Sequence, residues 1–153
     1  MKRFAGLCVL LFAAFSLGYA LRDLQNETRP HPLPPEESGT RVEVILFRGG
    51  GYCPVCDDLE RNAQEALEGP LSGDVAAGRL SFRKLSLEEP ENERYIETYG
   101  LFGTTLVVSL VRNGREIRFR NLEEAYRLAD RPEAFRPFFL QALAPFLKEA
   151  VAP

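Results

Sequence analysis

"VILFRGGGYCPVC", residues 44–56, decides the fold of this chain. It begins inside an apolar run, "RVEVILF" at 41–47, whose Val, Ile, Leu and Phe side chains are typical of a strand covered on both faces. Three glycines at 49–51 break that strand, and Cys53 and Cys56 follow them. The stretch therefore predicts a central strand, a glycine loop and then a pair of thiols.

A helix is expected to begin at this pair. From Cys53 onward, apolar residues recur at helical spacing, at Cys56, Leu59, Ala63, Ala66 and Leu67. Pro54 falls in the first turn, where a helix tolerates a missing N–H. The two cysteines thus lie at a strand-to-helix junction.

The rest of the chain alternates between strand and helix patterns. We expect a loop at 69–78, strands at 79–87, 105–111 and 116–120, and helices at 89–100, 122–129 and 132–150. The early strands need crossover helices, whereas the last two are joined by a short hairpin. This order predicts an α/β domain of three layers, with a central mixed four-stranded sheet flanked by helices.

Turn and cap residues mark several of these boundaries. Gly100 should stop the helix at 89–100, and the Asn113-Gly114 pair predicts a hairpin turn. Asn121 and Glu124 have the spacing of a capping box for the helix at 122–129. The final helix contains two prolines, at 137 and 145, which should bend or interrupt it.

Composition limits the classes of function. The 153 residues are 45% hydrophobic with a net charge of -3, which predicts one globular domain, at 41–153, and argues against nucleic acid as a partner. Arginines in the second half are interpreted as solubilising charges. His31 is the only histidine and lies in a Pro-rich linker at 22–40. Mechanisms and zinc sites that need an imidazole in the folded domain are therefore disfavoured.

The N-terminal residues predict export. Lys2 and Arg3 precede an uncharged apolar run from Phe4 to Leu21. Residues 1–21 are either a secretory signal peptide or an uncleaved membrane anchor. In both cases the domain is exported, to the periplasm or another extracytoplasmic space, with the membrane as a partner if the segment is retained.

The position of the cysteines predicts redox chemistry. Unpaired N–H groups at a helix start favour a thiolate, so we expect a lowered thiol pKa. Cys53, nearer the tip, is the expected nucleophile, and Cys56, one turn further in, the resolving thiol that closes the disulfide. Asp57 and Asp58 carry negative charge that opposes a thiolate, so the pKa should not be extremely low.

Three other interpretations remain open. The pair could form a static disulfide, as is common in exported proteins. Alternatively, Cys53 and Cys56 could be two ligands of a metal site in a binding module or metallochaperone, completed by a second copy, glutathione or a partner. A non-catalytic interaction subunit is the third. No cofactor is expected for the redox interpretation.

Two segments resemble the thioredoxin-like superfamily: "VILFRGGGYCPVC" and "YGLFGTTLVVSLVRNG" at 99–114. More narrowly, "CPVC", "LEEPENERYIETYGL", "NLEEAYRLAD" and the Phe-rich final helix resemble the ArsF-type subunits of nitrophenyl-compound nitroreductase. The wider resemblance implies a thiol-disulfide oxidoreductase. The narrower one implies an electron-transfer subunit beside a partner protein, either a membrane protein or a reductase subunit.

The sequence departs from the thioredoxin pattern at the site itself. Gly103-Thr104-Thr105 stands where the superfamily usually has a cis-proline, so we expect a trans bond at Thr104, or a strained one, and more room beside the sulfurs. Tyr52 replaces a tryptophan, and the preceding strand offers no buried carboxylate. Tyr52, Pro54, Val55, Thr104 and Thr105 are the residues expected to line the site. These differences favour exchange with one dedicated partner.

Overall fold

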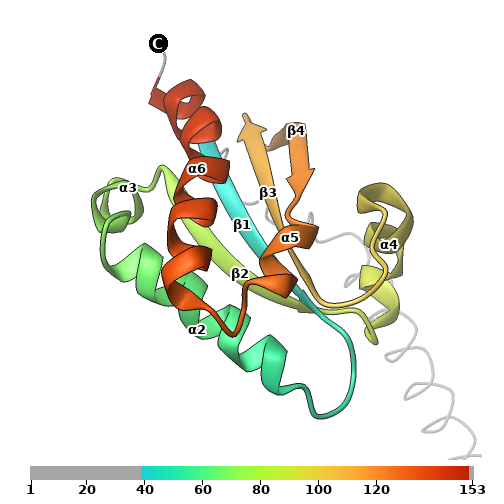
Figure 1. The fold of residues 1–153 in the computed structure, drawn as a ribbon. Helices are drawn as coiled ribbons and strands as arrows, with labels where there is room; N and C mark the ends of the chain where they lie inside the picture. Colours follow the sequence, from blue (N-terminus) through green and yellow to red (C-terminus); the bar gives the residue numbers. More distant parts are fainter. Residues whose placement is uncertain (1–38, 152–153) are drawn as a thin grey trace, which may run out of the picture. The chain divides into compact units, whose positions relative to one another are not determined.

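The computed structural model describes residues 39–151. The predicted segments at 1–21 and most of 22–40 lie outside these residues. The elements follow the order β1 (Thr40–Arg48), α2 (Pro54–Glu68), α3 (Ser72–Ala76), β2 (Leu80–Ser86), the 3-10 turn η1 (Pro90–Asn92), α4 (Glu93–Tyr99), β3 (Thr105–Arg112), β4 (Arg115–Asn121), α5 (Glu123–Arg127) and α6 (Pro132–Val151). Figure 1 shows their arrangement.

The four strands form one mixed sheet in the order β2-β1-β3-β4. β1 pairs with β2 in parallel and with β3 in antiparallel orientation, so that Val44 lies opposite both Phe82 and Val108. β3 and β4 form the predicted hairpin, whose turn residues Asn113 and Gly114 both have positive φ. The predicted α/β fold with a mixed four-stranded sheet is confirmed.

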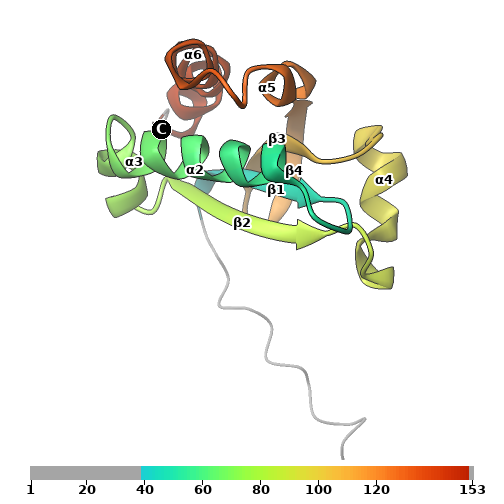
Figure 2. The same cartoon turned by 60° about the horizontal axis from the view of Figure 1, so that its bottom comes forward.

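Helices cover both faces of this sheet. Figure 2 shows α2, α5 and α6 on one side of the sheet and α4 at the right of the view, beyond the arrowhead of β2. The larger core joins Leu46 of β1 and Leu59 of α2 to Phe139 of α6, all fully buried. On the other face Ile45 and Phe47 pack against α4. β1 is therefore the central, doubly covered strand that its apolar run predicts.

Tyr99, the last residue of α4, joins this second core to β4. Its hydroxyl donates a hydrogen bond of 2.7 Å to a carboxylate oxygen of Glu116. Burial raises the pKa of Tyr99, and the hydrogen bond and negative charge of Glu116 raise it further. Tyr99 is thus held in its neutral form.

Gly100 ends α4 with φ 62 in the left-handed region, as predicted, because glycine adopts this conformation without a steric cost. On the other face, the buried Asn62 of α2 donates a hydrogen bond of 2.7 Å to the carbonyl of Ala129. This bond fixes α2 to the turn between α5 and α6.

Two local predictions were wrong, and a third, that the prolines bend or interrupt the final helix, was wrong about the interruption. The expected loop at 69–78 contains the short helix α3. Asn121 ends β4 and does not cap α5, because its amide bonds the Thr105 hydroxyl and the Tyr99 carbonyl. α6 is not interrupted at Pro137 or Pro145. Both prolines are exposed, so the carbonyls left without a helical N–H face the solvent side, where water can bond them.

Candidate active site

The glycine loop delivers Cys53 to the start of α2. β1 ends at Arg48, and Gly51 turns the chain with φ +82. Cys53 is the N-cap residue of α2, and its sulfur accepts a hydrogen bond from the Cys56 N–H at 3.2 Å. Pro54 follows at the first helical position, as its sequence context predicts.

Cys53 and Cys56 form a disulfide, with their Cα atoms 5.2 Å apart. The two sulfurs differ in their surroundings. Cys53 is partly exposed, whereas Cys56 is only 1% exposed and belongs to the buried face of α2. A thiol from another molecule can therefore reach Cys53 but not Cys56.

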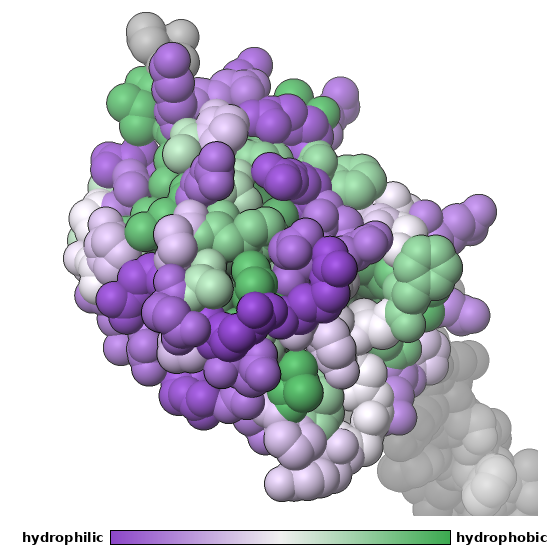
Figure 3. Space-filling view, viewed as in Figure 1, coloured by the Kyte–Doolittle hydropathy of each residue, from purple (hydrophilic) through white to green (hydrophobic). Residues whose placement is uncertain are grey.

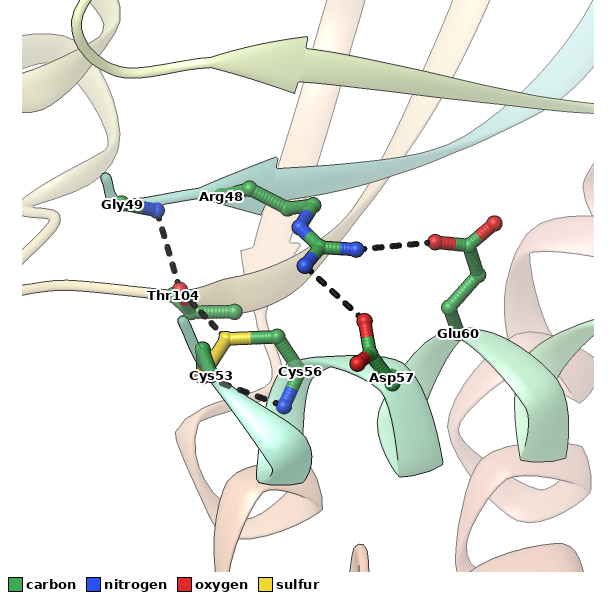
Figure 4. Close-up of a disulfide and its surroundings, with 7 residues drawn as sticks. All are labelled: Arg48, Gly49, Cys53, Cys56, Asp57, Glu60 and Thr104. Atoms are coloured by element: carbon green, nitrogen blue, oxygen red, sulfur yellow. Dashed lines mark hydrogen bonds and ion pairs between the residues drawn. A yellow bond between two sulfur atoms is a disulfide. The ribbon is translucent and has the colours of Figure 1, made fainter. Parts of the chain in front are cut away.

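Thr104 lies against the inner sulfur (Figure 4). Its hydroxyl oxygen accepts the Gly49 N–H at 3.0 Å and lies 3.1 Å from the sulfur of Cys56. A disulfide sulfur carries no hydrogen, so the hydroxyl is the donor in the second contact. This hydroxyl holds the glycine loop and can also stabilise negative charge on Cys56.

The backbone at Thr104 agrees with the prediction. No peptide bond between residues 39 and 151 is cis, so the expected trans bond is confirmed. On the side of Cys56 the Thr104 hydroxyl contacts the sulfur, and the extra room expected beside the sulfurs stays a prediction. The missing proline has thus been replaced by a polar contact.

Ion pairs compensate the acidic residues near the helix start. The guanidinium of Arg48 lies 2.9 Å from Asp57 and 3.2 Å from Glu60, as Figure 4 shows. Glu60 also pairs with Lys84 at 2.7 Å, and Asp58 pairs with Arg61. The negative charge that was expected to oppose a thiolate is therefore balanced by basic residues.

The other predicted site residues surround this centre at different depths. Tyr52 is 92% exposed, and Pro54 is also exposed. Val55 is partly buried and packs against the main core. Thr105 is buried and directs its hydroxyl to Asn121, away from the sulfurs. Their roles in catalysis remain predictions.

Sequence reasoning missed Arg48 and the backbone N–H of Gly49. A signal for Arg48 was available, because a basic residue at the end of β1 faces acidic residues at Asp57 and Glu60 in the first two turns of α2. Gly49 carried no such signal, because its N–H depends on how the Thr104 loop docks.

Two further observations concern the alternatives. Within residues 39–151, no group of three or more His, Cys, Asp or Glu side chains is arranged to hold a metal ion. Among the described residues, Cys53 and Cys56 thus have no third such side chain arranged beside them. In the same part of the chain, no helix combines the length and the apolar character needed to cross a membrane.

Comparison with known proteins gives a likeness of fold. No protein family and no curated protein matches the chain. Among solved structures, a thioredoxin from Thermus thermophilus is similar, with 21% identity and a TM-score of 0.46 over 73% of this chain and 78% of that one. A thioredoxin from Malassezia sympodialis shares 16% identity, with a TM-score of 0.40 over 70% and 79% of the two chains.

Thioredoxin f2 of Chlamydomonas reinhardtii is also similar, with 13% identity and a TM-score of 0.36 over 67% of this chain and 86% of that one. At these identities and scores the likeness supports no statement about substrate or partner. The disulfide and its contacts therefore carry the chemistry of this chain.

Proposed function

We propose that this chain is an exported thiol-disulfide oxidoreductase that exchanges electrons with a dedicated protein partner through Cys53 and Cys56. The observation that carries the proposal is the asymmetry of the disulfide. Cys53 offers an accessible sulfur at a helix start, and the buried Cys56 sulfur has a hydroxyl donor beside it. A static disulfide would need neither feature.

The reaction proceeds in two exchange steps. A thiolate of the partner attacks the Cys53 sulfur; the bond between Cys53 and Cys56 breaks, and Cys56 leaves as a thiolate stabilised by Thr104. A second partner thiolate then attacks the partner sulfur of the mixed disulfide, and Cys53 leaves as a thiolate. The partner loses two electrons and forms a disulfide, and the pair gains two electrons.

The reverse sequence reduces a partner disulfide. Cys53 then attacks the partner, and Cys56 resolves the mixed disulfide. The relative reduction potentials of the two proteins set the direction. Under the narrower resemblance to ArsF-type subunits, the partner would be a reductase subunit and the chain an accessory that transfers electrons to it.

The proposed location rests on the N-terminal sequence. Lys2, Arg3 and the apolar run to Leu21 support export across a membrane, followed by cleavage or anchoring. Fusion of a reporter enzyme that is active only outside the cytoplasm to the C-terminus tests this location. The fusion of the unaltered chain should show reporter activity. Replacing Phe4–Leu21 by a polar segment should abolish it, and unchanged activity would contradict export.

Trapping of a mixed disulfide tests the chemistry. Cys8, in the N-terminal apolar run, is the third cysteine of the chain and is replaced by serine in these experiments. In the full chain with Cys8→Ser, the further change Cys56→Ser should leave Cys53 bonded to its partner, because nothing resolves the intermediate. The matched control is Cys53→Ser, which leaves only the buried Cys56 and should trap nothing. Equal trapping by both variants would contradict the assigned roles.

A redox titration tests the pair independently of any partner. Equilibration of the same full-length Cys8→Ser chain in glutathione buffers should show a gain of two hydrogens by mass at one potential. If no buffer produces this change, the pair is not redox-active. Loss of cellular function when both cysteines are replaced is also expected; full function in that variant would favour the interaction subunit.

A further inference from the structure

A pocket of about 350 Å³ is lined by residues of the loop before β3 and of α5, and Thr104 is one of them. The loop before β3 contributes Phe102 and Thr104 to its wall, and α5 contributes Glu123 and Tyr126. Thr104 belongs to both places, because its hydroxyl lies 3.1 Å from the Cys56 sulfur. A polypeptide bonded to Cys53 therefore has its neighbouring residues within reach of this pocket.

Two aromatic side chains in the wall of the pocket are exposed. The side chain of Phe102 is 98% exposed, and that of Tyr126 is 43% exposed. On the face shown in Figure 3, hydrophilic residues cover most of the surface, and paler residues gather at the lower right, towards the start of α2. Exposed aromatic rings of this kind offer faces to a partner, and such faces attract cations.

Glu123 supplies the charge of the pocket. No ion pair or hydrogen bond of its carboxylate occurs within residues 39–151, whereas its neighbour Glu124 pairs with Arg127 at 3.0 Å. No described Lys, Arg or His lines the pocket. The carboxylate therefore attracts cations and repels anions.

The other polar side chains of the wall already have partners. Asn121 accepts a hydrogen bond from the Thr105 hydroxyl at 2.9 Å and donates one of 3.2 Å to the Tyr99 carbonyl. The Thr104 hydroxyl is shared between Gly49 and Cys56. Recognition in this pocket thus depends on two aromatic rings and one carboxylate, a combination that suits a cationic side chain.

We propose that the pocket binds a Lys or Arg side chain of the partner, from a residue that flanks the cysteine exchanging with Cys53. This inference rests on the proposed redox function and adds the class of partner segment to it. The basic residue would place its charge beside Glu123 and its stem against Phe102 and Tyr126. The pocket would therefore select among disulfides by the charge next to the cysteine.

Synthetic peptide disulfides test this selection. Each peptide carries one cysteine joined to a small thiol and one variable residue, Arg, Gln or Glu, at one of the two positions on either side of the cysteine. The full chain with Cys8→Ser is reduced, and the second-order rate constant for exchange with each peptide is measured by rapid mixing and mass spectrometry. At one position at least, the Arg peptide should react about tenfold faster than the Gln peptide at low salt.

Matched variants separate the pocket from general charge. Glu123→Gln should reduce the Arg preference to less than about threefold, and Glu124→Gln, which changes the net charge equally, should keep it. Equal rates for Arg, Gln and Glu peptides at every position, or equal effects of the two substitutions, would overturn the pocket assignment and leave the redox function intact. Failure of all peptides to form a mixed disulfide with Cys53 would overturn both.

Discussion

Thr104→Val removes the hydroxyl that contacts the inner sulfur and keeps the shape of the side chain. In the structure this hydroxyl lies 3.1 Å from the Cys56 sulfur, which under the proposed mechanism leaves as a thiolate when a partner thiolate attacks Cys53. A hydrogen bond to a charged group contributes about 1.5–3 kcal/mol. Because the disulfide sulfur also accepts a weak bond, we use the lower value, about 1.5 kcal/mol, for the difference between the two redox states.

This free energy converts directly into a reduction potential. For a two-electron couple, about 30 mV corresponds to about 1.4 kcal/mol and to a tenfold change in the equilibrium constant. The variant loses a bond that favours the reduced state. We therefore expect its potential to be about 30 mV more negative than that of the parent chain.

Glutathione titration of the full chain with Cys8→Ser measures the effect, with thiols counted by alkylation and mass. Thr104→Ser keeps the hydroxyl and should retain the parent potential. The matched control away from the sulfurs is Thr98→Val. It removes a hydroxyl that donates to the Arg94 carbonyl on the exposed face of α4. A Thr104→Val potential equal to those of both controls would refute the role of the hydroxyl.

Three further substitutions test the fold and the charges. Tyr99→Phe should lower the free energy of unfolding by about 1 kcal/mol at pH 8. The difference from the parent should shrink by up to about 1.4 kcal/mol per pH unit above about pH 10, because there the unfolded parent releases a proton that the folded one retains. Asn62→Ala should lower the free energy of unfolding by about 2 kcal/mol, since it leaves the buried Ala129 carbonyl unpaired. Arg48→Gln should make the potential about 10 mV more negative at low salt, and adding Asp57→Asn should reverse part of this shift.

Urea unfolding measures the first two effects, and the glutathione titration measures the third. A Tyr99→Phe difference that is constant from pH 8 to 11 would show that the raised pKa does not contribute to stability. An unchanged urea midpoint for Asn62→Ala would contradict the importance of the α2 contact. For Arg48→Gln, a shift that persists undiminished in high salt would exclude simple charge compensation.

The sheet could be predicted because its determinants are local. The strand predicted at 41–47 is observed at Thr40–Arg48. Its apolar run is typical of a buried strand, and the glycines that follow mark its end. The Asn113-Gly114 turn required positive φ, which these two residues tolerate best. Such signals depend on a few neighbouring residues, so the sequence is sufficient to locate them.

The contacts that were missed join distant segments. Asn121 has the spacing of a helix cap, yet bonds to Thr105 and the Tyr99 carbonyl satisfy its amide at the end of β4. Cys56 and Thr104 are 48 residues apart, and their contact exists only once β3 has docked beside the start of α2. The thiol pair and the place of Thr104 in the site were therefore predictable, whereas the contact between the Thr104 hydroxyl and the Cys56 sulfur was not.

The glycine loop is held by contacts at both of its ends, whereas its middle has few. Arg48 is fixed by acids on α2, Gly49 by Thr104, and Cys53 by the helix that it caps. Between these anchors, Gly50 faces only the flexible end of Glu88, and Tyr52 projects into solvent. Positions 50 and 52 can therefore accept side chains that suit new partners, whereas the positive φ of Gly51 keeps a glycine between them.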